Sequence, residues 1–236
     1  MLESREVLRI QDLHAYYGES HILHGVNLSV REGEVVTLLG RNGAGRTTTI
    51  KSLLGLVGRR TGSIQIQGQE TIDLQPHSIA RLGLGYCPEE RGIFSALSCE
   101  ENLLLPPVIA PNGMSVQEIY EMFPNLSERR NSPGTRLSGG EQQMLAVGRI
   151  LRTGERILLL DEISEGLAPV IVQALARMIR ALKQKGFTII MVEQNFRFAA
   201  PLADRFYVME HGQIVEGFAA AELQSKMDML HEYLGV

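Results

Sequence analysis

Hydrophobic and polar residues alternate in some stretches of the chain, and in others the hydrophobic residues recur at helical spacing. Alternating or continuous apolar runs predict strands at 7–17, 22–30, 34–39, 62–67, 84–87 and 187–192. Helical spacing predicts helices at 47–56, 76–81, 170–185 and 222–234. Two short runs, 206–209 and 213–215, flank His211 and Gly212 and indicate a hairpin. Strands that alternate with helices are typical of an α/β fold with a parallel sheet.

The pattern changes between about residues 88 and 150, where little strand character is present. A helix that begins near Glu100 should end before Pro106 and Pro107, because proline cannot continue a helix. Helical spacing resumes at 115–123, where Ser115 and Glu118 form a plausible capping box. We therefore expect one domain, with a core at about 1–87 and 151–236 and an inserted helical subdomain at about 88–150.

Composition narrows the function classes. The chain has 236 residues, 44% of them hydrophobic, and a formal net charge of −4, which gives no basic footprint for nucleic acid. Two cysteines do not form a disulfide framework and fit a reducing compartment. No apolar run reaches the roughly 18 residues of a membrane-spanning helix. We expect any role at a membrane to be carried out from the cytoplasmic surface by docking on partners.

A glycine-rich loop follows the buried run 34–39 and opens the helical stretch 47–56, which is the strand–loop–helix context of a P-loop. Its glycines allow backbone N–H groups to approach phosphates, and the helix N-terminus adds a favourable dipole. The hydroxyl of Thr47 is placed to ligate Mg²⁺. The predicted nucleotide-binding residues of this loop are Gly40, Arg41, Asn42, Gly43, Ala44, Gly45, Arg46, Thr47 and Thr48.

Arg46 occupies the position where P-loops usually have lysine. Arginine keeps the positive charge but spreads it over a larger planar group, so the exchange is not conservative at a tight site. We expect nucleotide binding to persist. Two outcomes stay open for the rate of hydrolysis. Either the neighbouring backbone accommodates Arg46 with little effect on the rate, or Arg46 lowers the rate.

A second apolar run, 156–160, ends in Asp161 and Glu162 and is typical of a central strand buried on both faces. Its end should deliver Asp161 beside the P-loop, where the carboxylate can hold Mg²⁺ through water. Glu162, one position further, points elsewhere and can orient or deprotonate an attacking water molecule. The sequence thus predicts one carboxylate for the metal and one for the water.

Between these two motifs lies the sequence LSGGEQQ, at 137–143. With both phosphate motifs it makes the chain resemble, over nearly its whole length, the ATP-binding subunits of ATP-binding cassette (ABC) transporters. The segments SEGLAP at 164–169 and VEQN at 192–195 are most similar to the ATPases of branched-chain amino acid importers. The resemblance implies a P-loop NTPase core with an antiparallel β subdomain and an inserted helical subdomain.

The resemblance also implies roles for further residues. Tyr17 would stack on adenine, and Gln194 would replace the usual histidine that contacts the γ-phosphate. Glu89 replaces a glutamine and could approach Mg²⁺ through water or pair with a basic group on the transporter. A solvated loop acid is the alternative. Ala168 replaces an aspartate of the dimer contact. The signature residues would cap the γ-phosphate held by a second subunit; they are Leu137, Ser138, Gly139, Gly140, Glu141 and Gln142.

The function that this resemblance implies is ATP hydrolysis, with ATP and Mg²⁺ bound, to power uptake of branched-chain or other apolar amino acids. The implied partners are permease subunits in the membrane, a second ATPase subunit of the same or a different kind, and indirectly a binding protein outside the membrane. The implied location is peripheral, on the cytoplasmic face of the membrane. Two alternatives stay open: a soluble ABC ATPase without a transport role, and a nucleotide-binding scaffold with weak turnover.

Overall fold

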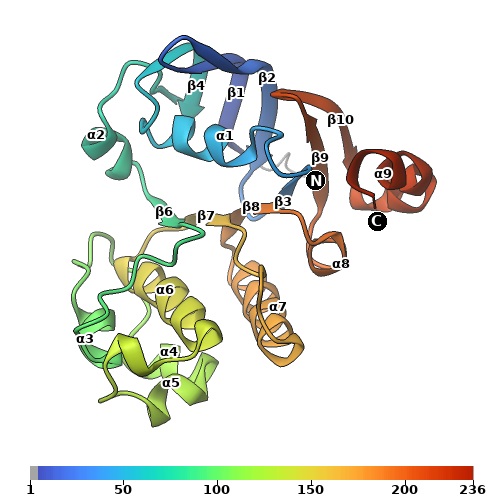
Figure 1. The fold of residues 1–236 in the computed structure, drawn as a ribbon. Helices are drawn as coiled ribbons and strands as arrows, with labels where there is room; N and C mark the ends of the chain where they lie inside the picture. The colour runs from blue at the N-terminus through green and yellow to red at the C-terminus, as the bar shows by residue number, and fades with distance from the viewer. Residues whose placement is uncertain (1–4, 236) are drawn as a thin grey trace.

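A computed structural model describes residues 5–235 of the chain. It contains two sheets (Figure 1). The smaller sheet is antiparallel and has the strand order β2-β1-β4-β5. Its strands are β1 (Glu6–Tyr17), β2 (Ser20–Arg31), β4 (Arg59–Ile66) and β5 (Gln69–Glu70).

The larger sheet has the order β10-β9-β3-β8-β7-β6, and neighbouring strands are parallel except for the hairpin of β9 and β10. Its strands are β3 (Val35–Leu39), β6 (Leu84–Cys87), β7 (Ile157–Asp161), β8 (Thr188–Glu193), β9 (Arg205–Glu210) and β10 (Gln213–Ala219). The predicted hairpin turn at His211 and Gly212 is confirmed, and both residues adopt positive φ. The two sheets confirm the expected α/β class with an antiparallel part.

Helices pack on both faces of the larger sheet. Those of the core are α1 (Arg46–Leu53), α2 (Pro76–Ala80), α7 (Pro169–Gln184), α8 (Phe196–Ala199) and α9 (Met227–Leu234). A separate group lies at one end of the molecule (Figure 1). It consists of α3 (Cys99–Leu104), α4 (Val116–Met122), α5 (Pro124–Glu128) and α6 (Gly139–Thr153). Among the described residues, no helix is long and apolar enough to span a membrane.

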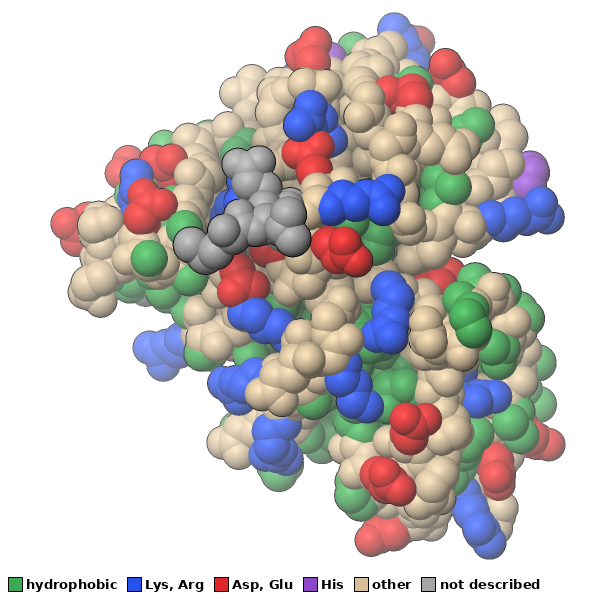
Figure 2. Space-filling view, turned by 180° about the vertical axis from the view of Figure 1, so that it is seen from behind, with side chains coloured by type: hydrophobic (Ala, Val, Ile, Leu, Met, Phe, Trp, Pro, Cys, Tyr) green, Lys and Arg blue, Asp and Glu red, His purple; other side chains and the backbone are tan. Residues whose placement is uncertain are grey.

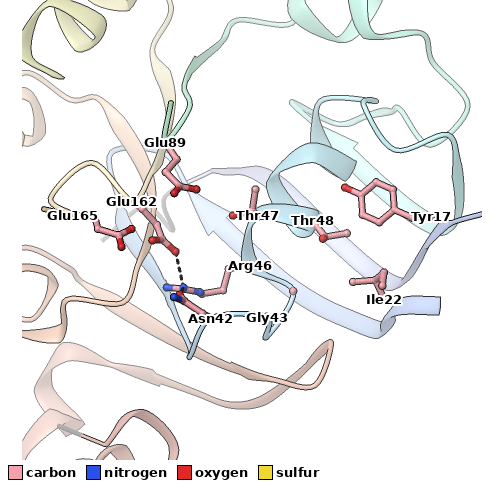
Figure 3. Close-up of a pocket in the computed structure, with 11 residues that line it drawn as sticks. Tyr17, Ile22, Asn42, Gly43, Arg46, Thr47, Thr48, Glu89, Glu162 and Glu165 are labelled. Atoms are coloured by element: carbon pink, nitrogen blue, oxygen red, sulfur yellow. Dashed lines mark hydrogen bonds and ion pairs between the residues drawn. The ribbon is translucent and has the colours of Figure 1, made fainter. Parts of the chain in front are cut away.

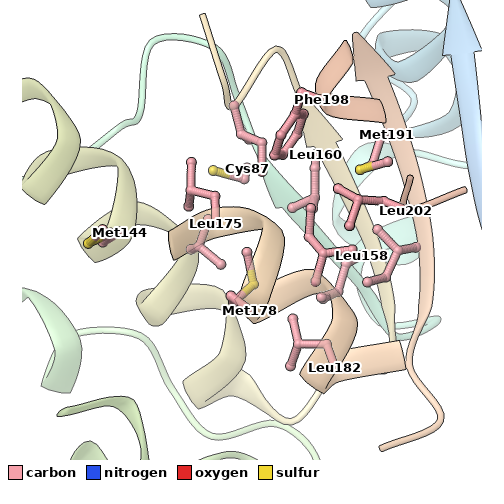
Figure 4. Packing of buried hydrophobic residues seen from close by; sticks show 14 of the residues in the cluster. Cys87, Met144, Leu158, Leu160, Leu175, Met178, Leu182, Met191, Phe198 and Leu202 are labelled. Atoms are coloured by element: carbon pink, nitrogen blue, oxygen red, sulfur yellow. The ribbon is translucent and has the colours of Figure 1, made fainter. Parts of the chain in front are cut away.

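Strand β7 shows how the core is divided. Leu158 and Leu160 face one hydrophobic cluster, which includes Leu175 and Met178 of α7 (Figure 4). Ile157 and Leu159 alternate with them and face a second cluster, which includes α1 and the antiparallel sheet. Because every side chain of β7 is buried, its sequence is a continuous apolar run instead of an alternating one.

Both cysteines are free and buried, and both belong to the first of these clusters. Cys87 ends β6, and its sulfur accepts a hydrogen bond from Gln143 of α6 at 3.5 Å. Burial and the charge of Asp161 raise the pKa of the Cys87 thiol to about 12. Burial also raises the pKa of the Cys99 thiol, to about 11. Cys87 thus touches the helical group from the edge of the core.

Two predicted helices differ in extent. The helix expected at 47–56 ends at Leu53, because Gly55 has a φ of 75° and turns the chain. The helix expected at 222–234 is a 3₁₀ segment, Ala220–Lys226, followed by α9. None of the 3₁₀ segment's residues is buried, whereas Leu230 of α9 is, so apolar contacts stabilise an α-helix only from Met227 onward.

Candidate nucleotide-binding site

A cavity of about 420 Å³ opens where the P-loop meets the ends of β1 and β7 (Figure 3). It gathers residues from four parts of the chain that are far apart in sequence. Tyr17 lies at one end and the carboxylates lie at the other (Figure 3). The lining residues are Tyr17, Ile22, Asn42, Gly43, Gly45, Arg46, Thr47, Thr48, Glu89, Glu162 and Glu165.

The P-loop has the backbone that its glycines predict. Gly43 and Gly45 have φ values of 81° and 106°, which strongly favour glycine. A Cβ at Gly40 would lie 2.5 Å from the carbonyl oxygen of Met209, so β9 also requires a glycine there. Gly45 is the N-cap of α1 and supplies no side-chain hydrogen bond, which leaves the first N–H groups of the helix available to a phosphate.

Arg46 is only 4% exposed, and its charge is paired inside the site. Its Nη2 donates to Glu162 Oε1 at 2.6 Å and to Asn42 Oδ1 at 3.2 Å (Figure 3). Its Nη1 is also buried and has no hydrogen-bond partner in the part of the chain that the structure describes. The guanidinium therefore binds the carboxylate expected to serve the water and keeps one donor for a further acceptor.

Thr47 and Asp161, the two predicted metal ligands next to the P-loop, lie together. Thr47 Oγ1 donates to Asp161 Oδ1 at 3.2 Å, and the hydroxyl of Tyr86 donates to Asp161 Oδ2 at 3.3 Å. Burial raises the pKa of Asp161, and these two hydrogen bonds oppose the rise. A hydroxyl and a carboxylate beside a phosphate loop are oxygen donors of the kind that Mg²⁺ prefers.

Glu89 does not join this pair. Its carboxylate lies with those of Glu162 and Glu165, and one oxygen of each is within 4.8 Å of the others. Burial, a hydrogen bond with Glu165 and the charge of Glu89 raise the pKa of Glu162, while Arg46 lowers it. The structure thus places the carboxylate of Glu89 beside that of Glu162, the residue expected to act on the water.

Glu162 is held in an unusual backbone conformation. Its φ is 48°, and its N–H donates to the carbonyl oxygen of Val192 at 2.9 Å. A non-glycine residue in this left-handed region costs about 1 kcal/mol or more, which the surrounding contacts must offset. This turn directs Glu162 into the cavity one residue after Asp161.

The remaining predicted site residues divide into two groups. Tyr17 is 46% exposed and lines the cavity (Figure 3). Gln194 is exposed and lies in an adjacent hollow of about 310 Å³, which also contains Glu162. Gly40, Arg41 and Ala44 do not line the cavity, and Arg41 instead donates to the carbonyl oxygen of Glu232.

The signature segment lies away from this cavity, and none of its residues lines it. Ser138 is the N-cap of α6 and forms a capping box with Glu141. Gln142 accepts a hydrogen bond from Arg91 at 3.0 Å. Within one chain the signature segment therefore starts α6, and it does not contribute to the cavity at the P-loop.

Sequence reasoning did not predict four features of this region: Ile22 and Glu165 in the cavity wall, the Tyr86–Asp161 bond, the Arg46–Glu162 pair and the burial of Glu193. Glu165 lies in SEGLAP and Glu193 in VEQN, two segments read only for their resemblance. Each segment has an acidic residue close to a predicted catalytic residue, Glu165 near Glu162 and Glu193 next to Gln194. This proximity is the signal in the sequence that indicates a role for the two acids.

Comparison with known proteins agrees with this geometry. The family model described as ABC transporter matches residues 23–165. The chain is 40% identical to the high-affinity branched-chain amino acid transport ATP-binding protein BraG of Pseudomonas aeruginosa, over 97% of this chain and 100% of that protein. It is 33% identical to the lipopolysaccharide export system ATP-binding protein LptB of Acidithiobacillus ferridurans, over 98% of this chain and 97% of that one.

A solved structure of an ATP-binding subunit of an ABC transporter superposes with a TM-score of 0.80 at 27% identity, covering 98% of this chain and 100% of that one. The motifs, the phosphate loop and these relatives lead to one assignment. The chain belongs to the ABC transporter family and is one of its ATP-hydrolysing, ATP-binding subunits.

Proposed function

We propose that this chain is the ATPase subunit of an importer for branched-chain or other apolar amino acids. The choice of cargo rests on the similarity to BraG. The identity to BraG is higher than that to LptB, and the match covers the whole length of BraG. The similarity to LptB is lower by seven percentage points, 40% against 33%, so export of lipopolysaccharide is the second candidate.

In the proposed site, MgATP lies along the cavity between Tyr17 and Glu162. The N–H groups of Gly45 and the first turn of α1 bind the phosphates, and the ring of Tyr17 packs against adenine. Thr47 and Asp161 hold Mg²⁺, which offsets the negative charge of the phosphates. Arg46 transfers from Glu162 to a phosphate oxygen, which frees the Glu162 carboxylate to orient and deprotonate the attacking water.

The second half of the proposed site comes from another subunit. Ser138 is exposed as the N-cap of α6, and no signature residue lines the cavity for the chain's own phosphates. Ser138 and the N–H of Gly140, at the N-terminus of α6, instead cap the γ-phosphate of a partner. Gln194 lies beside Glu162 of the same chain, so its amide donates to the γ-phosphate in its own site, and Ala168 lies at the subunit contact. The partner is a second copy or a homologous ATPase. One catalytic unit is proposed, with the core at 1–87 and 151–236 and the helical subdomain at 88–150.

We place permease docking on the helical subdomain, with the chain peripheral on the cytoplasmic face of the membrane. A hollow of about 290 Å³ lies between the end of β6 and α6, and Arg91, Pro106 and Arg149 line it. Leu105 and Val108, beside Pro106 in sequence, are exposed apolar residues. A binding protein outside the membrane would act only through the permease, and no contact with nucleic acid is proposed.

The test combines turnover with transport. MgATP hydrolysis by the purified chain should rise faster than linearly with protein concentration, or on addition of its second ATPase, and Glu162→Gln should abolish it. In cells that depend on this chain, the same variant should stop uptake of radiolabelled leucine. Lost hydrolysis with unchanged leucine uptake would contradict the proposed cargo, and a lipopolysaccharide defect in those cells would favour the second candidate.

A further inference from the structure

Glu193 is a buried acid that the preceding mechanism does not use. It is the last residue of β8, and only 1% of its surface is exposed. Its Oε1 accepts the N–H of Ser164 at 3.2 Å, and its Oε2 accepts the Ser164 hydroxyl at 2.8 Å. Ser164 is itself 3% exposed. No lysine or arginine forms an ion pair with Glu193 among the described residues.

The contact joins the two loops that carry the proposed catalytic residues. Ser164 follows Glu162 by two residues, and Glu193 immediately precedes Gln194. The N–H of Glu162 is bound to Val192, the residue before Glu193. The end of β8 therefore holds the chain at Glu162 and again at Ser164, on either side of the turn that directs the Glu162 carboxylate into the cavity.

We propose that Glu193 is a positioning residue for ATP hydrolysis, which fixes Glu162 relative to the phosphates and to Gln194 through its two hydrogen bonds to Ser164. This inference rests on the proposed function of the site. Glu162 needs such support because its left-handed backbone is costly and a small rotation would move its carboxylate away from the water. A carboxyl buried on the neighbouring strand provides a rigid anchor that a loop residue could not.

Burial favours the neutral form of Glu193. Its pKa is raised to about 8, because burial, and to a smaller extent the charge of Glu162, outweigh the bonds from Ser164 and the charge of Arg46, which lower it. A second carboxylate charge behind Glu162 would compete for Arg46, which already pairs with Glu162. A neutral amide of the same shape, as in glutamine, can accept the Ser164 N–H and donate to its hydroxyl, so it preserves the anchor.

The test uses the full chain in the assembly that hydrolyses ATP. Glu193→Ala and Ser164→Ala should each lower kcat about tenfold while leaving MgATP affinity within about threefold, because they loosen Glu162 and not the phosphate loop. The double variant should lose no more than Glu193→Ala alone, since Glu193→Ala already removes both hydrogen bonds, including the hydroxyl bond that Ser164→Ala removes. Glu193→Gln should keep kcat within about twofold at pH 7 and lose the decline of the native rate above about pH 8.

A matched control exists in the antiparallel sheet. There Ser63 donates its hydroxyl to Glu70 at 2.5 Å, and neither residue lines the cavity, so Glu70→Ala should leave kcat unchanged. Folding is checked by thermal unfolding, and if Glu193→Ala does not fold, Ser164→Ala and Glu193→Gln decide. Unchanged kcat in Ser164→Ala, or equal losses in Glu193→Gln and Glu193→Ala, would overturn the inference. A native assembly that fails to hydrolyse ATP would instead overturn the proposed function.

Discussion

At the scale of single residues, Arg46 shows how one substitution changes the electrostatics of a P-loop. Its guanidinium is buried between Asn42 and Glu162 and still has a free donor at Nη1. In the proposed site a phosphate would bind this donor and compete with the Glu162 carboxylate for the charge of Arg46. The competition couples nucleotide binding to the release of Glu162, and it follows from the reach and the several donors of arginine.

Arg46→Lys and Arg46→Ala separate charge from shape. Lysine keeps the positive charge near the phosphates, so MgATP affinity should stay within about threefold of the native value. Alanine removes the charge and leaves Glu162 and Asn42 without their partner, so affinity should fall at least about tenfold. Titration calorimetry with MgATP measures both variants. If lysine weakens binding as much as alanine does, the planar fork itself is required.

At the scale of elements, the signature helix depends on a close approach to α7. A Cβ at Gly140 would lie 2.6 Å from Cγ1 of Ile171, whereas a Cβ at Gly139 would meet only the flexible end of Arg91 at 3.3 Å. Of the two adjacent glycines, only Gly140 is therefore required for packing within the chain. This requirement is separate from any role of the signature towards a partner's nucleotide.

Gly140→Ala should lower the free energy of unfolding by about 1–3 kcal/mol, because the added methyl group overpacks the α6–α7 contact. Gly139→Ala is the matched control and should be neutral or slightly stabilising, since alanine favours helices. Adding Ile171→Ala to Gly140→Ala should recover part of the loss. Urea unfolding measures all three, and equal stability of Gly139→Ala and Gly140→Ala would contradict the packing argument.

Local patterns predicted the elements better than the contacts between them. The strand, loop and helix of the P-loop, the capping box at Ser115 and the hairpin at His211 were all predictable, because each depends on neighbouring residues. Helix α5 was missed, because Pro124 starts a new helix directly after α4. The Arg46–Glu162 pair joins residues 116 positions apart, and hydrophobic periodicity carries no information about such a pair.

At the scale of the whole molecule, the parallel sheet explains why the site residues meet. Strands β3, β6, β7 and β8 run in the same direction, so their carboxyl ends lie at one edge. The P-loop follows β3, Glu89 follows β6, and Asp161 and Glu193 end β7 and β8. Ligands of open α/β sheets bind at this edge. A parallel arrangement of these strands is therefore sufficient to predict that the segments after them lie close together.

Burial of Glu193 also predicts how the stability of the whole chain depends on pH. Its pKa is about 8 in the folded chain and 4.5 ordinarily, so the folded chain holds this proton more tightly. Through this group the free energy of unfolding is highest below pH 4.5 and falls as the pH rises to about 8. Glu193→Gln removes the dependence and should raise Tm by about 3 °C or more at pH 8.5.

The gain should shrink steadily as the pH is lowered towards 4.5, where Glu193 is neutral in both states. Scanning calorimetry of the native chain and the variant at three pH values checks this trend. A difference in Tm that is the same at every pH would mean that Glu193 carries no charge penalty in the folded chain.

The two buried thiols have a practical consequence for measuring motion. Cys87 is covered by Gln143 where the core meets the helical subdomain, and its raised pKa leaves almost no thiolate at neutral pH. An alkylating reagent can therefore modify Cys87 only while that seam is open. The modification rate, followed by mass spectrometry with and without nucleotide, measures how often this seam opens and needs no introduced label.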